Sequence, residues 1–331
     1  MFHKLSLSLI FTFTLLLGAC APTAPAPMPV PPTAMSTLVP TAAPTAEPTA
    51  IPVFPLTLTD GAGRKVTIES APARIVSLSP SNTEILFAVG AGKLVVGDTK
   101  YCDFPVEAQN LTKIGGFSAD SISVETIVSL KPDLVLANSS GHEPVIKALT
   151  QANIKVIALD AKTFEDVYSN IELVGKITDH ETEAVSVVDG MKSRVAAVTQ
   201  KIASVAQDKR PTVFWEVWNE PLMTAGPNTF FGQMIGLAGG VSIFADVTGD
   251  WPQVSAEEII KRNPDFILGP DSHGDKLTAD LLAARPGWTQ ISAVKNGKIY
   301  LIDGNTSSRP GPRLVNALEA IAKALYPDLF K

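Results

Sequence analysis

The sequence predicts an α/β fold of two parallel-sheet, Rossmann-like lobes joined by a long backbone helix, with a ligand cleft between the lobes. The first observation is a helical period, because apolar residues recur every three or four positions from Thr163 to Ala206. The second is a repeat: SVETIVSLKPDLVLA at 123–137 returns as SAEEIIKRNPDFILG at 255–269, offset by 255 − 123 = 132 residues. A shorter echo pairs PSNTEI at 80–85 with PNTFF at 227–231. Similar halves on either side of a helical stretch indicate two similar lobes.

The first 55 residues have the composition of an export signal followed by a tether. Residues 1–20 form a basic start, an apolar run and a Leu-Gly-Ala-Cys ending at Cys20, which is the pattern of an export signal. That ending resembles the lipobox of bacterial lipoproteins, in which the cysteine is lipidated; a plain secretory signal is the alternative. Residues 21–55 are Pro/Ala/Thr-rich and favour an extended, disordered tether. We expect a protein anchored by lipidated Cys20 to the outer face of the membrane, or a periplasmic one.

Composition sets limits on partners and on folding. The 331 residues suffice for two domains, and a net charge of −6 offers no basic footprint for nucleic acid. Cys102 is the only other cysteine, so no intrachain disulfide is expected. We place the N-terminal lobe at 56–162, the connecting helix at 163–206 and the C-terminal lobe at 207–331.

In the N-terminal lobe, short apolar runs between turn residues predict strands, and capping residues predict helix starts. A hairpin is expected at 56–60 and 65–68, around Gly-Ala-Gly. Buried strands are expected at 74–78, 94–97, 113–115, 134–137 and 156–159. Helices are expected from Ser81, Ser123 and Glu143.

Beyond the connecting helix, where a break at Thr178–His180 indicates a joint between two helices, the same alternation resumes. Helices are expected after Thr229 and Ser255 and over 313–325. Strands are expected at 212–217, 241–244, 266–269 and 298–302. Strands that alternate with helices require parallel sheets covered on both faces.

In such sheets, ligands bind at the carboxyl ends of the strands. Glu125 and Glu257 belong there too, in the first turn of the repeated helices, although first-turn acids are also common simply because they stabilise helices. Loops at that edge carry aromatic, amide and histidine side chains: Tyr101, Phe117, Asn138, His142, Trp218, Trp251 and His273. The tryptophans have a core alternative. His142 and His273 are candidate axial ligands to a metal carried by the ligand, with solvated loop histidines as the alternative.

Motifs of catalysis are missing from the sequence. It has no Gly-rich phosphate loop, no GxSxG elbow and no HExxH helix. We therefore expect no enzyme activity, no cofactor and no metal bound directly by the protein.

Three segments carry a family resemblance: RIVSLSPSNTE at 74–84, the repeat at 123–137 and WPQVSAEE at 251–258. Together with the lipobox and tether, they resemble the helical-backbone substrate-binding proteins of ABC importers for cobalamin, haem and ferric siderophores. The resemblance covers residues 56–331. The vitamin B12-binding members are the most similar, through YCDFP at 101–105 and WPQVS at 251–255.

The resemblance implies roles for individual residues. Tyr101 and Trp251 would contact a corrinoid from opposite lobes, and Asn305–Arg309 would form a further ligand loop. Glu125 and Glu257 would dock onto arginines of the permease. The sequence departs from the family where Phe117 and Asn138 stand in place of tryptophans, where the Phe117 loop is two residues longer, and at 309–313, which is only loosely similar.

These features predict a monomeric, lipid-anchored receptor that captures cobalamin or a related corrinoid and delivers it to an ABC permease dimer, with modest lobe closure. A haem or ferric-siderophore binder is the alternative within this class, with Arg309 or Arg313 facing anionic groups. An anchored tetrapyrrole enzyme or chelatase, and an adhesive surface lipoprotein, are alternatives from other classes.

Overall fold

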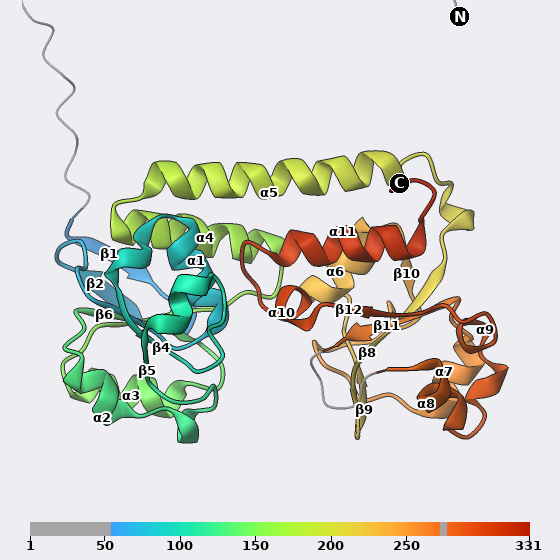
Figure 1. Ribbon diagram of the computed structural model, residues 1–331, viewed down its shortest axis with the longest axis horizontal. Helices are drawn as coiled ribbons and strands as arrows, with labels where there is room; N and C mark the ends of the chain where they lie inside the picture. The colour runs from blue at the N-terminus through green and yellow to red at the C-terminus, as the bar shows by residue number, and fades with distance from the viewer. Residues whose placement is uncertain (1–53, 272–276) are drawn as a thin grey trace, which may run out of the picture. The chain divides into compact units, whose positions relative to one another are not determined.

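The computed structural model describes residues 54–271 and 277–331, so Cys20 and His273 lie outside the described part of the chain. An antiparallel hairpin of β1 (Leu56–Thr59) and β2 (Lys65–Ile68) precedes two five-stranded sheets. Figure 1 shows the N-terminal lobe in blue to green and the C-terminal lobe in yellow to red. No helix of the described residues has the length and apolar character that a membrane crossing needs.

The N-terminal sheet has the strand order β5-β4-β3-β6-β7 and is parallel throughout. Numbered along the chain from β3, this is the 3-2-1-4-5 order of a doubly wound Rossmann-like half, whose switch point lies between β3 and β6. Its strands are β3 (Ile75–Ser77), β4 (Val95–Asp98), β5 (Thr112–Lys113), β6 (Leu134–Asn138) and β7 (Val156–Leu159). Its α-helices are α1 (Pro80–Ala88), α2 (Val124–Ser129) and α3 (Glu143–Gln151).

The C-terminal sheet repeats this plan with two differences, because among the described residues it has no counterpart of β5 and it gains an antiparallel strand. Its parallel strands run in the order β10-β8-β11-β12, and β9 pairs with β8 in the antiparallel direction. The strands are β8 (Thr212–Asn219), β9 (Leu222–Thr224), β10 (Val241–Ser242), β11 (Phe266–Pro270) and β12 (Ile299–Ile302). The helices are α6 (Phe230–Leu237), α7 (Ala256–Arg262), α8 (Ala279–Ala284), α9 (Ser292–Lys295), α10 (Gly304–Ser307) and α11 (Leu314–Leu325).

The sequence repeat is a structural repeat at the same offset. β6 and β11 span corresponding residues, and Lys131 and Asn263 before them both have positive φ, 50° and 44°. The Asp133 carboxylate accepts from the Arg74 backbone N–H, and that of Asp265 accepts from the Thr212 N–H. Each repeated aspartate therefore fixes the start of its lobe's central strand.

The connecting segment is a pair of helices, α4 (Phe164–Thr178) and α5 (Glu181–Ile202), separated at the expected joint, where Asp179 is left-handed. The two fold back and pack along each other (Figure 1). The segment 163–206 is therefore two packed helices and not one continuous helix. The 22 residues of α5 span ~33 Å and contact α1 of the N-terminal lobe and α6 and α11 of the C-terminal lobe.

One hydrophobic cluster runs through both lobes. It includes Leu86 of α1, Val188 of α5, Trp215 of β8 and Leu318 of α11, all essentially buried. Smaller clusters cover the other face of each sheet. Because the lobes share a close-packed core through α5, large hinge rotation about that helix would expose apolar surface and is disfavoured.

Three features of the C-terminal lobe differ from the sequence prediction. The segment 218–221, expected as a loop, is the tip of the β8–β9 hairpin. This makes the sheet mixed where parallel strands alone were expected. The helices α8, α9 and α10 have only six, four and four residues, which is too short to show a helical period, so they were missed.

Candidate functional site

Large aromatic side chains are exposed on both lobes. Their exposed fractions lie between 43% and 50% for Tyr101, Phe117, Trp218, Trp251 and Phe104, the last of which was not among the predicted site residues. They follow β4 and β5, or lie at the β8 tip and before α7, near the carboxyl ends of the strands as predicted. Because exposed aromatic rings are enriched at binding surfaces, these edges of the two lobes form the candidate ligand site.

Trp251 is held by other rings. Its ring meets those of Phe230 and Phe231 edge to face at 6.5 and 5.7 Å. The two phenylalanines are buried and begin α6, so one edge of the indole rests on the core while the rest is exposed. This packing fixes the ring before any ligand arrives, which reduces the entropy lost on binding.

His142 holds two loops of the N-terminal lobe together. It is buried, its Nδ1 accepts from the Asn138 backbone N–H at 3.1 Å, and its Nε2 lies 2.8 Å from the Phe117 carbonyl oxygen. Nε2 therefore carries the proton and donates it. Burial lowers the pKa of His142, although the Phe117 bond opposes this shift. Both ring nitrogens are occupied, so a metal would reach His142 only if one of these bonds broke.

Two arginines of the segment before α11 reach across to the N-terminal lobe. Arg313 binds the Glu84 carboxylate through two nitrogens, at 2.9 and 2.6 Å, and Arg309 binds it at 3.2 Å. Arg309 also contacts Asp103 at 2.5 Å and Asn305 at 2.7 Å. Burial opposes ionisation of Asp103, but the bond and charge of Arg309 outweigh it and lower the pKa of that carboxyl. Arg309 thus joins the lobes rather than standing free for a ligand.

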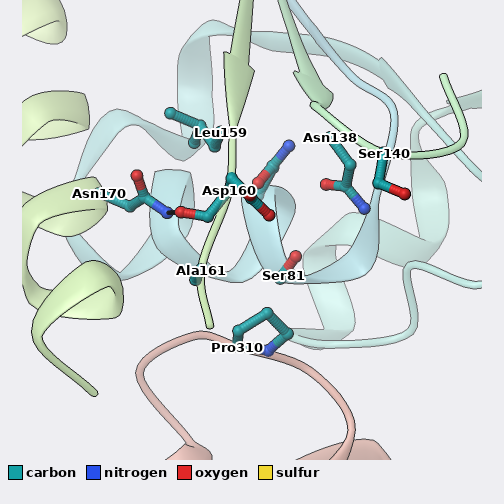
Figure 2. Close-up of a pocket in the computed structure, with 9 residues that line it drawn as sticks. Ser81, Asn138, Ser140, Leu159, Asp160, Ala161, Asn170 and Pro310 are labelled. Atoms are coloured by element: carbon teal, nitrogen blue, oxygen red, sulfur yellow. Dashed lines mark hydrogen bonds between the residues drawn. The ribbon is translucent and has the colours of Figure 1, made fainter. Parts of the chain in front are cut away.

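A small polar cavity of about 160 Å³ lies beside these arginines. Figure 2 shows Pro310 approaching Ser81 from the segment that carries Arg309. The other lining residues are mainly polar and come from the carboxyl edge of the N-terminal sheet and from α4: Asn82, Asn138, Ser140, Leu159, Asp160, Ala161 and Asn170. Among the described residues, the cavity is lined by hydrogen-bond donors and acceptors, by the Asp160 carboxylate and by no basic side chain.

Beneath Tyr101 lies a buried polar group. The Cys102 sulfur is 3.2 Å from both the Thr83 and Thr99 hydroxyls, and Lys113 Nζ is 2.7 Å from Asp98 Oδ1. Burial raises the pKa of Asp98 to about 6, against the opposing effect of Lys113. Cys102 is buried and held in hydrogen bonds, which fits a structural role.

Glu125 and Glu257 occupy the same position in each lobe. Both are exposed in the first turn of their helices, whose N-caps Ser123 and Ser255 accept backbone N–H bonds at 3.1 Å. Glu257 also lies at the rim of a cavity of about 490 Å³ that includes Trp288. Capping is done by the serines, so the glutamate side chains remain directed at solvent or a partner.

No group of three or more His, Cys, Asp or Glu residues suited to a metal ion occurs in 54–271 and 277–331. Glu84 and Phe104 are members of the candidate site that were not among the predicted site residues, whereas Arg313 was expected only in the alternative with an anionic ligand. A glutamate inside an otherwise buried helix was the available signal, because a buried carboxylate requires a partner.

The sequence pattern of the periplasmic binding protein family matches residues 75–306. The chain belongs to this family. An ABC transporter substrate-binding lipoprotein of Bacillus subtilis, YvrC, described as uncharacterized, is 39% identical over 284 residues, which cover 84% of this chain and 88% of that protein. A cobalamin-binding protein of Halobacterium salinarum is 31% identical over 279 residues, 82% of this chain and 74% of its own. The structure of a Staphylococcus epidermidis protein, described as possibly iron-binding and periplasmic solute-binding, is 34% identical with a TM-score of 0.70, over 78% of this chain and 100% of that one.

These likenesses confirm the resemblance that the repeated motifs predicted, and the fold class with it. In this periplasmic binding protein, the family pattern spans both sheets and the helices that join them. It therefore includes every described residue of the predicted site except Arg309.

Proposed function

We propose that this protein is the lipid-anchored, extracytoplasmic substrate-binding component of an ABC importer, and that it captures cobalamin or a related corrinoid between its two lobes. The observation that carries the proposal is the set of exposed aromatic rings on both lobes, Tyr101 and Phe117 on one and Trp218 and Trp251 on the other. A large, flat macrocycle offers apolar faces to such rings.

The polar groups of the site favour an uncharged ligand. Arg309 and Arg313 are already paired with Glu84, and the cavity lined by Asn82 and Asn138 contains amides and hydroxyls. A corrinoid carries amide side groups, which such residues can bind as donors and acceptors. The cobalamin-binding relative supports the same ligand class.

A haem or ferric-siderophore ligand is the second candidate. The Staphylococcus epidermidis structure, described as possibly iron-binding, supports it. Arg309 and Arg313 would then have to leave Glu84 to meet anionic groups, and His142 would have to leave Phe117 to meet iron. Both changes cost hydrogen bonds to buried groups, which places this candidate second.

Titration of the mature protein with cyanocobalamin and with haem tests the proposal. Calorimetry and tryptophan quenching report binding, while the absorbance spectrum reports changes at the metal. We expect saturable cobalamin binding and no Soret shift with haem. Haem binding with a Soret shift that is lost in His142→Ala would support the haem or ferric-siderophore ligand instead. Turnover of a tetrapyrrole would indicate an enzyme.

The anchor and the permease complete the proposal. Cys20→Ser should move the protein from the membrane fraction to the soluble fraction in its host, with export intact. Retention of that variant in the membrane would exclude a lipid on Cys20. Glu125 and Glu257 are the proposed contacts with the permease, one on each lobe, and the domain division at 56–162, 163–206 and 207–331 places one on either side of the connecting segment.

A further inference from the structure

We propose that Glu84 is a specificity-determining residue, which keeps the ligand site from accepting anionic chelates by neutralising Arg309 and Arg313. The inference rests on the proposed function, because it takes the ligand to bind between the lobes. The inference adds to the proposed function the charge class of the ligand and the residue that selects for that charge class.

The first observation is that the Glu84 side chain is buried more deeply than those of its two arginine partners. Its side chain is 1% exposed, while those of Arg309 and Arg313 are 13% and 19% exposed. A buried carboxylate is stable only when its oxygens are paired, and both Glu84 oxygens accept from guanidinium groups. The charges of both arginines are therefore matched by a carboxylate that is buried more deeply than they are.

The second observation is the charge of the cluster. Arg309 and Arg313 carry two positive charges, and Glu84 and Asp103 carry two negative charges, so the four side chains sum to zero. The Arg313 guanidinium also stacks over the exposed Phe104 ring, 4.1 Å from its centroid. A ligand that contacts Phe104 therefore meets a guanidinium whose charge is compensated.

The third observation concerns two lysines, of which Lys162 is paired with a carboxylate and Lys100 lies over an aromatic ring. Lys162 pairs with Asp250 at 2.8 Å, and the Lys100 ammonium lies 5.1 Å from the Tyr101 ring centroid. The neighbouring cavity includes the Asp160 carboxylate and no basic residue. An anionic group would meet compensated arginines on one side and a carboxylate on the other.

Removal of the Glu84 charge would weaken this preference for an uncharged ligand. In Glu84→Gln the shape of the side chain is kept, but the cluster gains one net positive charge and a guanidinium becomes available to an anion. A matched control exists in the same molecule: Glu216, 4% exposed, binds Arg285 through two bonds of 2.6 and 2.8 Å within the C-terminal lobe. Glu216→Gln removes a buried carboxylate charge of the same kind without touching Arg309 or Arg313.

The experiment compares the dissociation constants of cyanocobalamin and haem for the wild-type protein, Glu84→Gln, Glu84→Asp and Glu216→Gln. We expect the affinity for haem relative to cyanocobalamin to rise about tenfold in Glu84→Gln, the effect of one charge-assisted hydrogen bond. Glu84→Asp should keep the wild-type ratio because it keeps the charge, and Glu216→Gln should keep it as well. An unchanged ratio in Glu84→Gln, or an equal rise in Glu216→Gln, would overturn the proposal.

A ligand-free measurement separates this inference from the proposed function. If the wild-type protein binds neither compound, the proposed ligand fails, and the rate at which phenylglyoxal modifies Arg309 and Arg313 still tests the role of Glu84. Peptide mass spectrometry should show faster modification of these two arginines in Glu84→Gln than in wild type or Glu216→Gln. Equal rates in all three proteins would show that Glu84 does not hold the arginines.

Discussion

The two lobes share a scaffold and differ in the residues that we propose face a ligand. Both have the central strand fixed by an aspartate, Asp133 or Asp265, and a serine-capped helix with an exposed glutamate. The N-terminal lobe adds β5 and the His142 bonds, whereas the C-terminal lobe adds the β8–β9 hairpin with Trp218. Under the proposed function, the duplicated glutamates would serve docking to the permease, and the features unique to each lobe would serve ligand recognition.

The largest expected effect concerns the duplicated glutamates. Replacing Glu125 and Glu257 together by Ala should abolish ligand uptake by cells while ligand affinity stays unchanged, because both side chains are exposed away from the core. Uptake of labelled ligand and calorimetry on the same variants provide the two readouts. Glu143, an exposed first-turn glutamate of α3 outside the repeat, gives the control Glu143→Ala, which should transport normally. Normal uptake by the double variant would remove the docking role.

The buried ion pairs of the two lobes should differ in stability. Arg285→Ala leaves Glu216 buried without its ion-pair partner, which costs about 3–5 kcal/mol of unfolding free energy. Arg309→Ala should cost less, about 1–2 kcal/mol, because Glu84 keeps its two bonds to Arg313. Urea denaturation of both variants measures the difference. A larger loss of unfolding free energy in Arg309→Ala than in Arg285→Ala would mean that the contacts between the lobes limit stability.

His142 tests whether the N-terminal lobe positions its aromatic ring or coordinates a metal. His142→Ala removes the bonds to Asn138 and Phe117, so we expect ligand affinity to fall about tenfold, with no change in the absorbance spectrum of the bound ligand. His180→Ala, at the α4–α5 joint, is the control and should bind normally. A spectral change confined to His142→Ala would indicate coordination instead.

The smallest expected effect is a dependence on pH that belongs to the N-terminal lobe. The pKa of Asp98 is about 6 in the folded protein and near 4 in an unfolded chain, so the folded state binds the proton more tightly. The contribution of Asp98 to stability is therefore fully present below pH 4 and is lost as the pH rises to about 6. Thermal unfolding of wild type and Asp98→Asn between pH 4 and 7 should show this slope in wild type only. Parallel stability curves for the two proteins would show that the pH dependence comes from titratable groups other than Asp98.

The regular scaffold could be predicted from the sequence because it follows local rules. The strands β6 and β11 are short apolar runs after a Pro-Asp stop, and the caps Ser123 and Ser255 precede a glutamate in the first turn. The constant offset of the repeat then predicted that the two lobes have similar elements in the same order, without structural information on either lobe.

The tertiary pairings could not be predicted in this way. Glu84 and Arg313 are separated by 229 residues, and their contact depends on how the lobes meet. The folding of α4 back along α5 likewise depends on the left-handed Asp179, since a helical period alone does not distinguish one long helix from two packed helices. The cavity beside Pro310 has the same origin, because its walls come from distant segments.

In the proposed function, one macrocycle contacts exposed aromatic rings on each lobe, including Tyr101 on the N-terminal lobe and Trp251 on the C-terminal lobe. The most direct measurement is the affinity of cyanocobalamin for Tyr101→Ala, Trp251→Ala and the double variant, each determined by calorimetry. Each single change should weaken binding about tenfold or more, and the two losses should add within about 0.5 kcal/mol, because the side chains meet different faces of the ligand. Wild-type affinity in either single variant would contradict the claim, because the ligand would then bind to one lobe alone.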